Sequence, residues 1–363
     1  IRLKAPPLVV LAAIEGWRAQ ALRSMLQRTA GQDAGIGLDR PVPELQASLG
    51  PNDAVVSYYF DERGGGIGLV MTQGKVEQVA ISGLDELPGL RDRVLPALDV
   101  GNPEAQPTIA KDVVPEALAR DLRRLTQLLI APLKLPANVE TVTIVPDQKL
   151  YWVPWGSLAL PADTARDDGH LRPIAHRFAL SILPSAVIRE PPGPIALDKA
   201  VLVASTLGVP DKSLRQFIPS LAGAPGKIEL GALSFTRTEV EGIARSLQRG
   251  NVPTRPATII STPADVARLP AFVQSEFPKA GVIHIAGHGV FDTADGMVSA
   301  MLLGGTDPRG VLRAGDFARL DLKSVGLVVL SGCETGKVVL RKGQEAFGFV
   351  RGVLVAGARR AIV

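Results

Sequence analysis

The sequence predicts an α/β protein that is built on a mostly parallel sheet with helices on both faces. After residue 195, short apolar runs of strand length alternate with longer runs of helical length. Strands that are joined by helices in this way lie parallel in a sheet that the helices cover. The chain has 363 residues, which is enough for two or three compact units or for one large α/β domain. Only 4% of them are aromatic, so Val, Leu, Ile and Ala must fill the core.

The first third of the chain predicts a different arrangement. Residues 1–38 are expected to form a helical lead and a linker, because apolar residues recur at near-helical spacing from Ala12 onward. We interpret this lead as the end of an upstream helical domain. A short helix that begins at Pro43 then precedes three strand-like runs separated by turn residues, which predicts an antiparallel meander. The three strands are expected at 53–60, 67–71 and 78–81.

Helices and strands alternate in the next hundred residues. The second helix carries a stripe of leucines at helical spacing, which is typical of a helix with one buried face. Three prolines between residues 191 and 194 then stiffen the chain, and we place a lobe boundary there. The expected elements are helices at 87–98 and 114–133 and strands at 142–145, 150–153 and 177–182.

The parallel sheet is expected in the C-terminal part. One of its helices begins with Thr262 as cap and Pro263 at the first helical position, as helix N-termini prefer. The expected strands are 200–204, 258–260, 282–286, 327–330 and 361–363, with helices at 238–247, after Thr262, and at 344–356.

Each of two predicted strands leads into a reactive side chain that directly follows a glycine. The run at 282–286 opens into Gly287-His288-Gly289, and the run at 327–330 leads into Ser331-Gly332-Cys333-Glu334. Functional groups of open α/β sheets gather at the carboxyl ends of the strands. A thiol and an imidazole presented there are the parts of a cysteine nucleophile and its base, and the thiolate is the reactive form.

Structural explanations compete with this interpretation. A free cysteine is often a small buried hydrophobe, but Gly-His-Gly at the matching strand end favours a nucleophile for Cys333. His284 lies within its strand, on the same face as His288, and we interpret it as a structural or supporting residue. His170 and His176 are expected to be solvated. The spacing of Cys and His matches no zinc site, so we predict no metal and no cofactor.

Three sequence blocks carry a resemblance to a known family. They are His-x-Ala-Gly-His-Gly at 284–289, Leu-Ser-Gly-Cys-Glu-Thr-Gly at 330–336, and the Gln-Glu-Ala-Phe-Gly-Phe-Val-Arg-Gly run that begins at 344. Weaker blocks lie at 144–155, 183–185 and 238–240. Together they resemble the CHAT family of caspase-like proteases, often fused to TPR repeats, over roughly residues 40–363. The gap of 45 residues (333 − 288) between His and Cys fits a caspase-type dyad, where it is roughly 50.

The resemblance implies a caspase-like sheet preceded by a non-catalytic, pseudo-caspase-like α/β lobe. Residues 39–190 would form that N-terminal lobe of the CHAT module, and residues 195–363 the catalytic lobe. Cys333 would be the nucleophile and His288 the general base and acid. The backbone N–H groups of Gly289 and Cys333 are expected to form an oxyanion hole.

The substrate pocket is less well defined by the sequence. Ser331 shares a strand face with Cys333, so we expect it to line the first substrate pocket. Related proteases that cut after Arg or Lys place an acid in that pocket, and the acids near this site are Asp292 and Glu334. Both acids also have a simple explanation as solvated surface groups.

The leading hypothesis is a bacterial, cytoplasmic cysteine endopeptidase that acts in programmed cell death or defence. Its expected partners are a protein substrate and an activating protein or an upstream TPR domain. The net charge of 40 − 36 = +4 is too small to predict nucleic-acid binding, and no run approaches the roughly 18 apolar residues of a membrane span. A single cysteine forms no internal disulfide, which suits a reducing cytosol.

Two alternatives stay open at this point. The same fold is compatible with a catalytically silent pseudoprotease scaffold that binds a partner protein. It is also compatible with another cysteine hydrolase or an acyltransferase.

Overall fold

The chain forms two compact units in the computed structural model. Unit 1 comprises residues 1–19 and 39–188, and unit 2 comprises residues 20–38 and 189–363. The division at Ile188 lies next to the prolines at 191–194. The structure describes residues 5–29, 40–61, 65–98, 114–160, 171–188, 199–333, 339–341 and 345–363.

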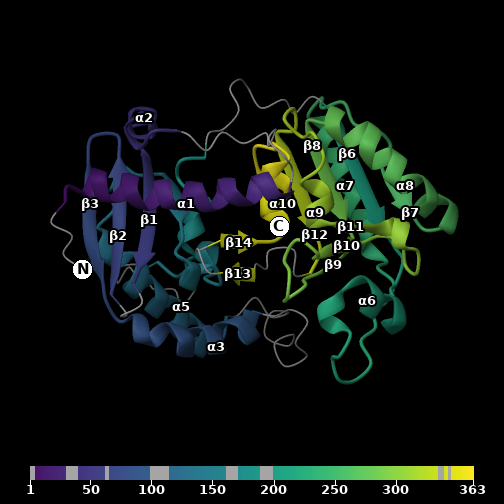
Figure 1. Ribbon diagram of the computed structural model, residues 1–363, viewed down its shortest axis with the longest axis horizontal. Coiled ribbons are helices and arrows are strands. Elements are labelled where there is room, and N and C mark those ends of the chain that lie inside the picture. The colour runs from purple at the N-terminus through teal and green to yellow at the C-terminus, as the bar shows by residue number, and fades with distance from the viewer. Residues whose placement is uncertain are drawn as a thin grey trace. The chain divides into compact units, whose positions relative to one another are not determined.

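Unit 1 is built on a five-stranded sheet with the strand order β3-β2-β1-β4-β5, and Figure 1 shows β3, β2 and β1 side by side. Strands β1, β2 and β3 pair antiparallel, which confirms the predicted meander, whereas β4 and β5 extend the sheet in parallel. Helices α3 and α5 contribute buried apolar residues to the core of this sheet, among them Leu87 and Leu90 of α3 and Leu122 and Leu125 of α5. Helix α1 (Pro7–Thr29) belongs to unit 1 up to Ala19. The other elements of unit 1 are α2 (Val42–Ala47), β1 (Asp53–Phe60), β2 (Gly66–Thr72), β3 (Val76–Ile81), α3 (Leu87–Leu98), α5 (Glu116–Leu129), β4 (Thr141–Val145) and β5 (Ala179–Ile182).

The strand predicted at 150–153 is wrong. The Asp147 carboxylate accepts the N–H of Lys149, and the N–H of Leu150 donates to the Asp147 carbonyl, so the chain turns into a 3₁₀ helix at Gln148–Leu150. Leu150 is nevertheless fully buried, which explains why its apolar neighbourhood resembled a strand. The following Trp155 stacks on Tyr58 of β1, with 5.5 Å between the ring centroids.

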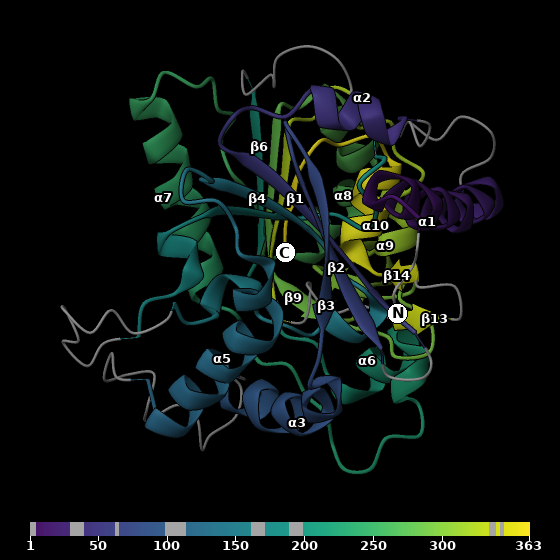
Figure 2. The same ribbon diagram turned by 90° about the vertical axis from the view of Figure 1, so that its left-hand side faces the viewer.

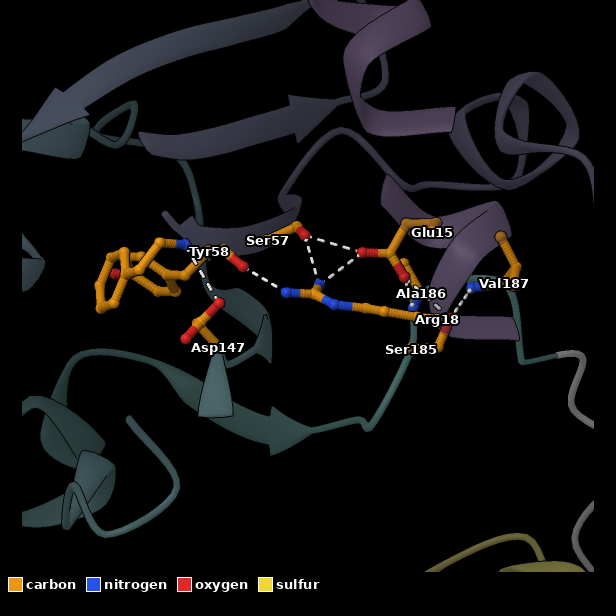
Figure 3. Close-up of polar contacts among 9 residues, drawn as sticks. Glu15, Arg18, Ser57, Tyr58, Asp147, Ser185, Ala186 and Val187 are labelled. Carbon is orange, nitrogen blue, oxygen red and sulfur yellow. Dashed lines mark hydrogen bonds and ion pairs between the residues drawn. The ribbon is translucent and has the colours of Figure 1, made fainter. Parts of the chain in front are cut away.

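Helix α1 is anchored in unit 1 by two buried charged residues, Glu15 and Arg18 (Figure 3). One carboxylate oxygen of Glu15 accepts hydrogen bonds from the Arg18 guanidinium and the Ser57 hydroxyl, both at 2.7 Å. The other accepts from the Ser185 hydroxyl at 2.8 Å and from the N–H of Ala186 at 2.7 Å. Arg18 also donates to the Ser57 oxygen at 2.8 Å and to a carbonyl oxygen of β1. The helix is therefore tied to the sheet by a buried, mutually satisfied polar cluster.

We expect Glu15→Ala to lower the free energy of unfolding of unit 1 by about 3–5 kcal/mol, because it leaves the buried Arg18 charge without its partner. Urea unfolding followed by tryptophan fluorescence measures this, since all three tryptophans, Trp17, Trp152 and Trp155, belong to unit 1. The double variant Glu15→Leu/Arg18→Met is the control and should recover most of the loss. Equal stability of Glu15→Ala and the unmodified protein would contradict the anchoring role.

Unit 2 is built on a five-stranded, fully parallel sheet with the order β15-β12-β8-β6-β7. Alternate strand residues pack against α7 on one face and against α8, α9 and α10 on the other. Figure 2 shows α7 on one side of β6 and helices α8 and α10 on the other side. The predicted α/β fold with a parallel sheet between helices is confirmed. The elements are β6 (Ala200–Ser205), α7 (Phe235–Arg249), β7 (Thr258–Ile260), α8 (Pro263–Glu276), β8 (Val282–Ala286), α9 (Ala314–Phe317), β12 (Leu327–Ser331), α10 (Phe349–Val355) and β15 (Ala361–Ile362).

Several short elements of unit 2 were not expected. Three strands of three residues form a small antiparallel sheet in the order β11-β10-β9. The helix predicted at 344–356 begins only at Phe349, because residues 345–347 form a strand that pairs with residues 339–341. Gly348 between them has φ 157° and ψ −164°, a conformation that is essentially confined to glycine. These elements are α6 (Asp211–Phe217), β9 (His288–Val290), β10 (Ala300–Leu302), β11 (Val311–Arg313), β13 (Val339–Arg341) and β14 (Glu345–Phe347).

The described helices include none that combines the length and the apolar character of a membrane span.

Candidate active site

His288 and Cys333 lie at the same level beyond two neighbouring parallel strands. Strands β8 and β12 pair so that Ala286 lies opposite Ser331. His288 is two residues beyond Ala286, and Cys333 is two residues beyond Ser331. The N–H of Gly287 donates to the Ser331 carbonyl at 3.0 Å, which continues the pairing toward both residues. The fold therefore brings the two backbone segments that carry the predicted dyad to one edge of the sheet.

The backbone at Gly332 packs directly on the segment that carries His288. A Cβ atom added at Gly332 would lie 2.7 Å from the Gly287 carbonyl oxygen and 2.9 Å from the Gly289 nitrogen. This contact requires a residue without a side chain. Because Gly332 immediately precedes Cys333, the two backbone segments that were predicted to supply the oxyanion hole are neighbours.

We expect Gly332→Ala to lower kcat/KM for any reaction at Cys333 by about 10²-fold, because the added methyl group must displace one segment by a fraction of an ångström or more. Gly242→Ala on α7 is the matched control, since its added Cβ would meet only the end of the Arg245 side chain at 3.9 Å. The alkylation rate of Cys333 by iodoacetamide measures the effect without a substrate. Equal rates for the two variants would show that the Gly332 contact does not position the site.

The His288 ring is oriented by a backbone carbonyl. Its Nε2 lies 2.7 Å from the carbonyl oxygen of Gly231, and since a carbonyl only accepts, Nε2 carries the proton. The neutral ring then offers Nδ1 as its basic nitrogen. Burial lowers the pKa of His288, and the hydrogen bond to Gly231 opposes this only in part, so the imidazole is neutral at pH 7. A neutral, half-buried imidazole that keeps a nitrogen lone pair at Nδ1 is suited to accept a proton.

Gly231 was not predicted as part of this site. Its contribution is a main-chain carbonyl, which every residue possesses, so the residue type carries no signal. It lies 57 residues before His288, in the connection between α6 and α7.

Cys333 is a free cysteine with an exposed side chain. The explanation that it is a small buried hydrophobe is therefore wrong. Ser331 is half-buried at the end of β12. Glu334 lies outside the described residues.

Asp292 is buried, and its carboxylate is engaged by a loop. One oxygen accepts the N–H groups of Ala294 and Asp295, both at 2.8 Å, and the other accepts the N–H of Ser220 at 3.0 Å. Burial opposes ionisation of Asp292, but the hydrogen bonds from these groups outweigh it, so its pKa lies below the usual range. These hydrogen bonds indicate that the Asp292 carboxylate stabilises the surrounding loops and does not face a substrate.

The other histidines have separate roles. His284 is buried, and its Nε2 lies 2.8 Å from a carboxylate oxygen of Glu239 on α7. This pair accounts for His284 as a structural residue that ties β8 to α7. His176 is exposed, as expected, and His170 lies outside the described residues. Among the described side chains, no group of three or more His, Cys, Asp or Glu is placed to hold a metal ion.

A parallel α/β sheet between helices, with histidine and cysteine beyond neighbouring strand ends, is consistent with a caspase-like fold. The chain belongs to the CHAT-domain family, whose model matches residues 119–363, more than half of the chain. The resemblance inferred from the sequence is thereby confirmed over these residues, whereas residues 40–118 lie outside the match. A search of curated proteins found no match.

Proposed function

We propose that this protein is a caspase-like cysteine endopeptidase with Cys333 as nucleophile and His288 as general base and acid. The observation that carries the proposal is the Gly231 carbonyl, which accepts the Nε2 proton of His288 at 2.7 Å. A hydrogen bond at that nitrogen fixes the tautomer that leaves Nδ1 for the thiol. Register supports the pairing, because both residues lie two positions beyond paired residues of β8 and β12.

The reaction begins when Nδ1 of His288 takes the proton from the Cys333 thiol. The thiolate attacks the carbonyl carbon of the scissile peptide bond, and the electron pair of the C=O bond moves onto the oxygen. The N–H groups of Gly289 and Cys333 stabilise this oxyanion. His288 then gives its proton to the leaving amine as the C–N bond breaks, and a thioester remains. Water, deprotonated by His288, hydrolyses the thioester and restores the thiol.

The burial of His288 supports this sequence of steps. The base must be neutral at the start of each cycle, and a pKa lowered by burial keeps it so at neutral pH. The proposal extends to a protein as substrate, to a partner protein that controls the activity, and to a cytoplasmic, reducing compartment in which a free thiol persists.

The test compares the N-termini that the protein creates in a cell proteome before and after treatment with iodoacetamide. Cys333 is the only cysteine, so alkylation modifies no other thiol of the chain. We expect a limited set of new N-termini with the untreated protein and none after alkylation. A peptide acyloxymethyl ketone should label Cys333 in the same preparation. The same N-termini after alkylation, or neither cleavage nor labelling, would overturn the proposal.

A further inference from the structure

We infer that Arg215 is a positioning residue for His288, because its guanidinium shapes the connection that presents the Gly231 carbonyl to the imidazole. This connection, residues 218–234 between α6 and α7, is called the carbonyl loop here. The consequence for turnover rests on the proposed function, whereas the consequence for the histidine ring does not.

The guanidinium of Arg215 binds three main-chain carbonyls of the carbonyl loop. One terminal nitrogen donates to Leu221 at 2.9 Å and to Ala224 at 2.8 Å, and the other donates to Gly226 at 2.5 Å. The left-handed turn at Gly226, with φ +77°, brings its carbonyl within reach. Only arginine carries several donors in a fixed, planar fork, so this set of contacts is specific to the residue type.

Asp211 completes the arrangement from the opposite side. Its two oxygens accept the Nε–H of Arg215 at 2.9 and 3.0 Å, and one of them also accepts the N–H of Ile228 at 2.8 Å. The hydrogen bond from Arg215 and the one from Ile228 lower the pKa of Asp211. The pair therefore fixes the carbonyl loop at four points between residues 221 and 228.

The fixed part of the loop leads directly to the residue that contacts His288. Val209 and Leu230 exchange two main-chain hydrogen bonds, of 2.8 and 3.0 Å, one residue before Gly231. Beyond Gly231, the N–H of Leu233 donates to the Thr206 carbonyl at 3.2 Å. Gly231 is thus held between two anchored positions, and the first of them follows the segment that Arg215 shapes.

The carbonyl loop and the strand of His288 also share one apolar cluster. Leu221, Ile228 and Leu230 pack against a core that includes Val290 of β9 and Leu302 of β10. His288 lies opposite Leu302 in the pairing of β9 with β10. A change in the path of the carbonyl loop is therefore expected to shift both Gly231 and the strand that carries His288.

A second tie joins the beginning of the loop to the segment after β9. The N–H of Ser220 donates to Asp292, and the N–H of Thr293 donates to the Ser220 hydroxyl at 3.3 Å. This tie holds the start of the loop, whereas Arg215 and Asp211 determine the path from there to Leu230.

The test measures the tautomer of His288 by NMR of protein labelled with ¹⁵N-histidine, in the unmodified chain and in Arg215→Met. The chain has four histidines, and the spectrum of His288→Gln assigns the signal. We expect a protonated Nε2 in the unmodified protein. In Arg215→Met, a mixture of tautomers and an exchange of the Nε2 proton with water at least about 10-fold faster are expected, because the carbonyl is no longer held.

Arg319→Met is the matched control. Arg319 also pairs with a nearby aspartate, Asp316, at 3.3 Å, but it is exposed and lies in the turn after α9. Arg215→Lys keeps the charge and loses the fork, so it should give an intermediate change and serves if Arg215→Met does not fold. For peptide cleavage, kcat should fall about 10-fold with KM unchanged, since Arg215 binds the loop and not the substrate.

The outcomes separate this inference from the proposed function. A changed tautomer in a protein that cleaves no peptide supports the inference and removes the protease proposal. An unchanged tautomer and unchanged kcat in folded Arg215→Met and Arg215→Lys overturn the inference while the protease proposal stands. The same change in Arg319→Met also overturns it.

Discussion

Replacing Cys333 with serine is expected to lower kcat for peptide cleavage by about 10⁴–10⁶-fold, the loss that follows removal of a nucleophile that acts as a unit with its base. An alcohol holds its proton far more tightly than a thiol, so the imidazole of His288 does not generate enough of the attacking anion. The side chain of Cys333 is exposed, so the substitution disturbs no packing. Single-turnover cleavage of a peptide substrate measures the change.

The thermal midpoint of Cys333→Ser should equal that of the unmodified protein, which separates lost chemistry from lost folding. Retention of more than a tenth of the original rate would mean that another group attacks the substrate.

The second large effect is expected from His288→Gln, with kcat lower by about 10²–10⁴-fold. Glutamine keeps an N–H donor for the Gly231 carbonyl but offers no basic nitrogen. In the unmodified protein the reactive form contains neutral imidazole, so the rate falls as the pH decreases through the pKa of His288. Burial sets that pKa below the ordinary value of 6.5, so the acid limb of the pH profile should lie below 6.5.

The rate of Cys333 alkylation by iodoacetamide as a function of pH measures this without a substrate. In His288→Gln the acid limb that His288 causes should disappear. Alkylation at the original rate across the whole range would contradict the role of His288 as base. His284→Gln is the control, because His284 is engaged by Glu239 and should leave the pH profile of the thiol unchanged.

The parallel sheet of unit 2 could be predicted because its strands are apolar and are separated by helices. Ile283 and Ile285 pack on one face while Val282 and Ala286 pack on the other, so both faces of the strand are buried and His284 is its one polar residue. The strands β9, β10 and β11 could not be predicted in the same way. Each has three residues, which is too few for an alternating pattern.

The helix predicted at 344–356 illustrates a different limit. Residues 345–347 are compatible with a helix by composition, but Gly348 and pairing with residues 339–341 turn them into a strand. Pairing with another segment overrides local preference, and the sequence of residues 345–347 alone does not contain that information.

The reactive side chains of the candidate site could be predicted from the sequence, whereas the contribution of the Gly231 main-chain carbonyl could not. His288 and Cys333 carry chemistry and stand beside glycines, so their residue types point to them. The Gly231 carbonyl contacts His288, and the Arg215 guanidinium binds main-chain carbonyls of the carbonyl loop. Both sets of contacts form only when the loop folds, so the residue types do not indicate them. The same holds for Glu15, whose partners Ser57 and Ser185 are 42 and 170 residues away.

The single exposed thiol determines which covalent products can form when this chain is oxidised. A polypeptide with one thiol can join covalently to at most one other copy, so oxidation yields linked pairs and no larger covalent species. Each such pair consumes two reactive sulfurs at once. Both molecules of a linked pair are unable to react, and a reductant such as dithiothreitol returns them to use.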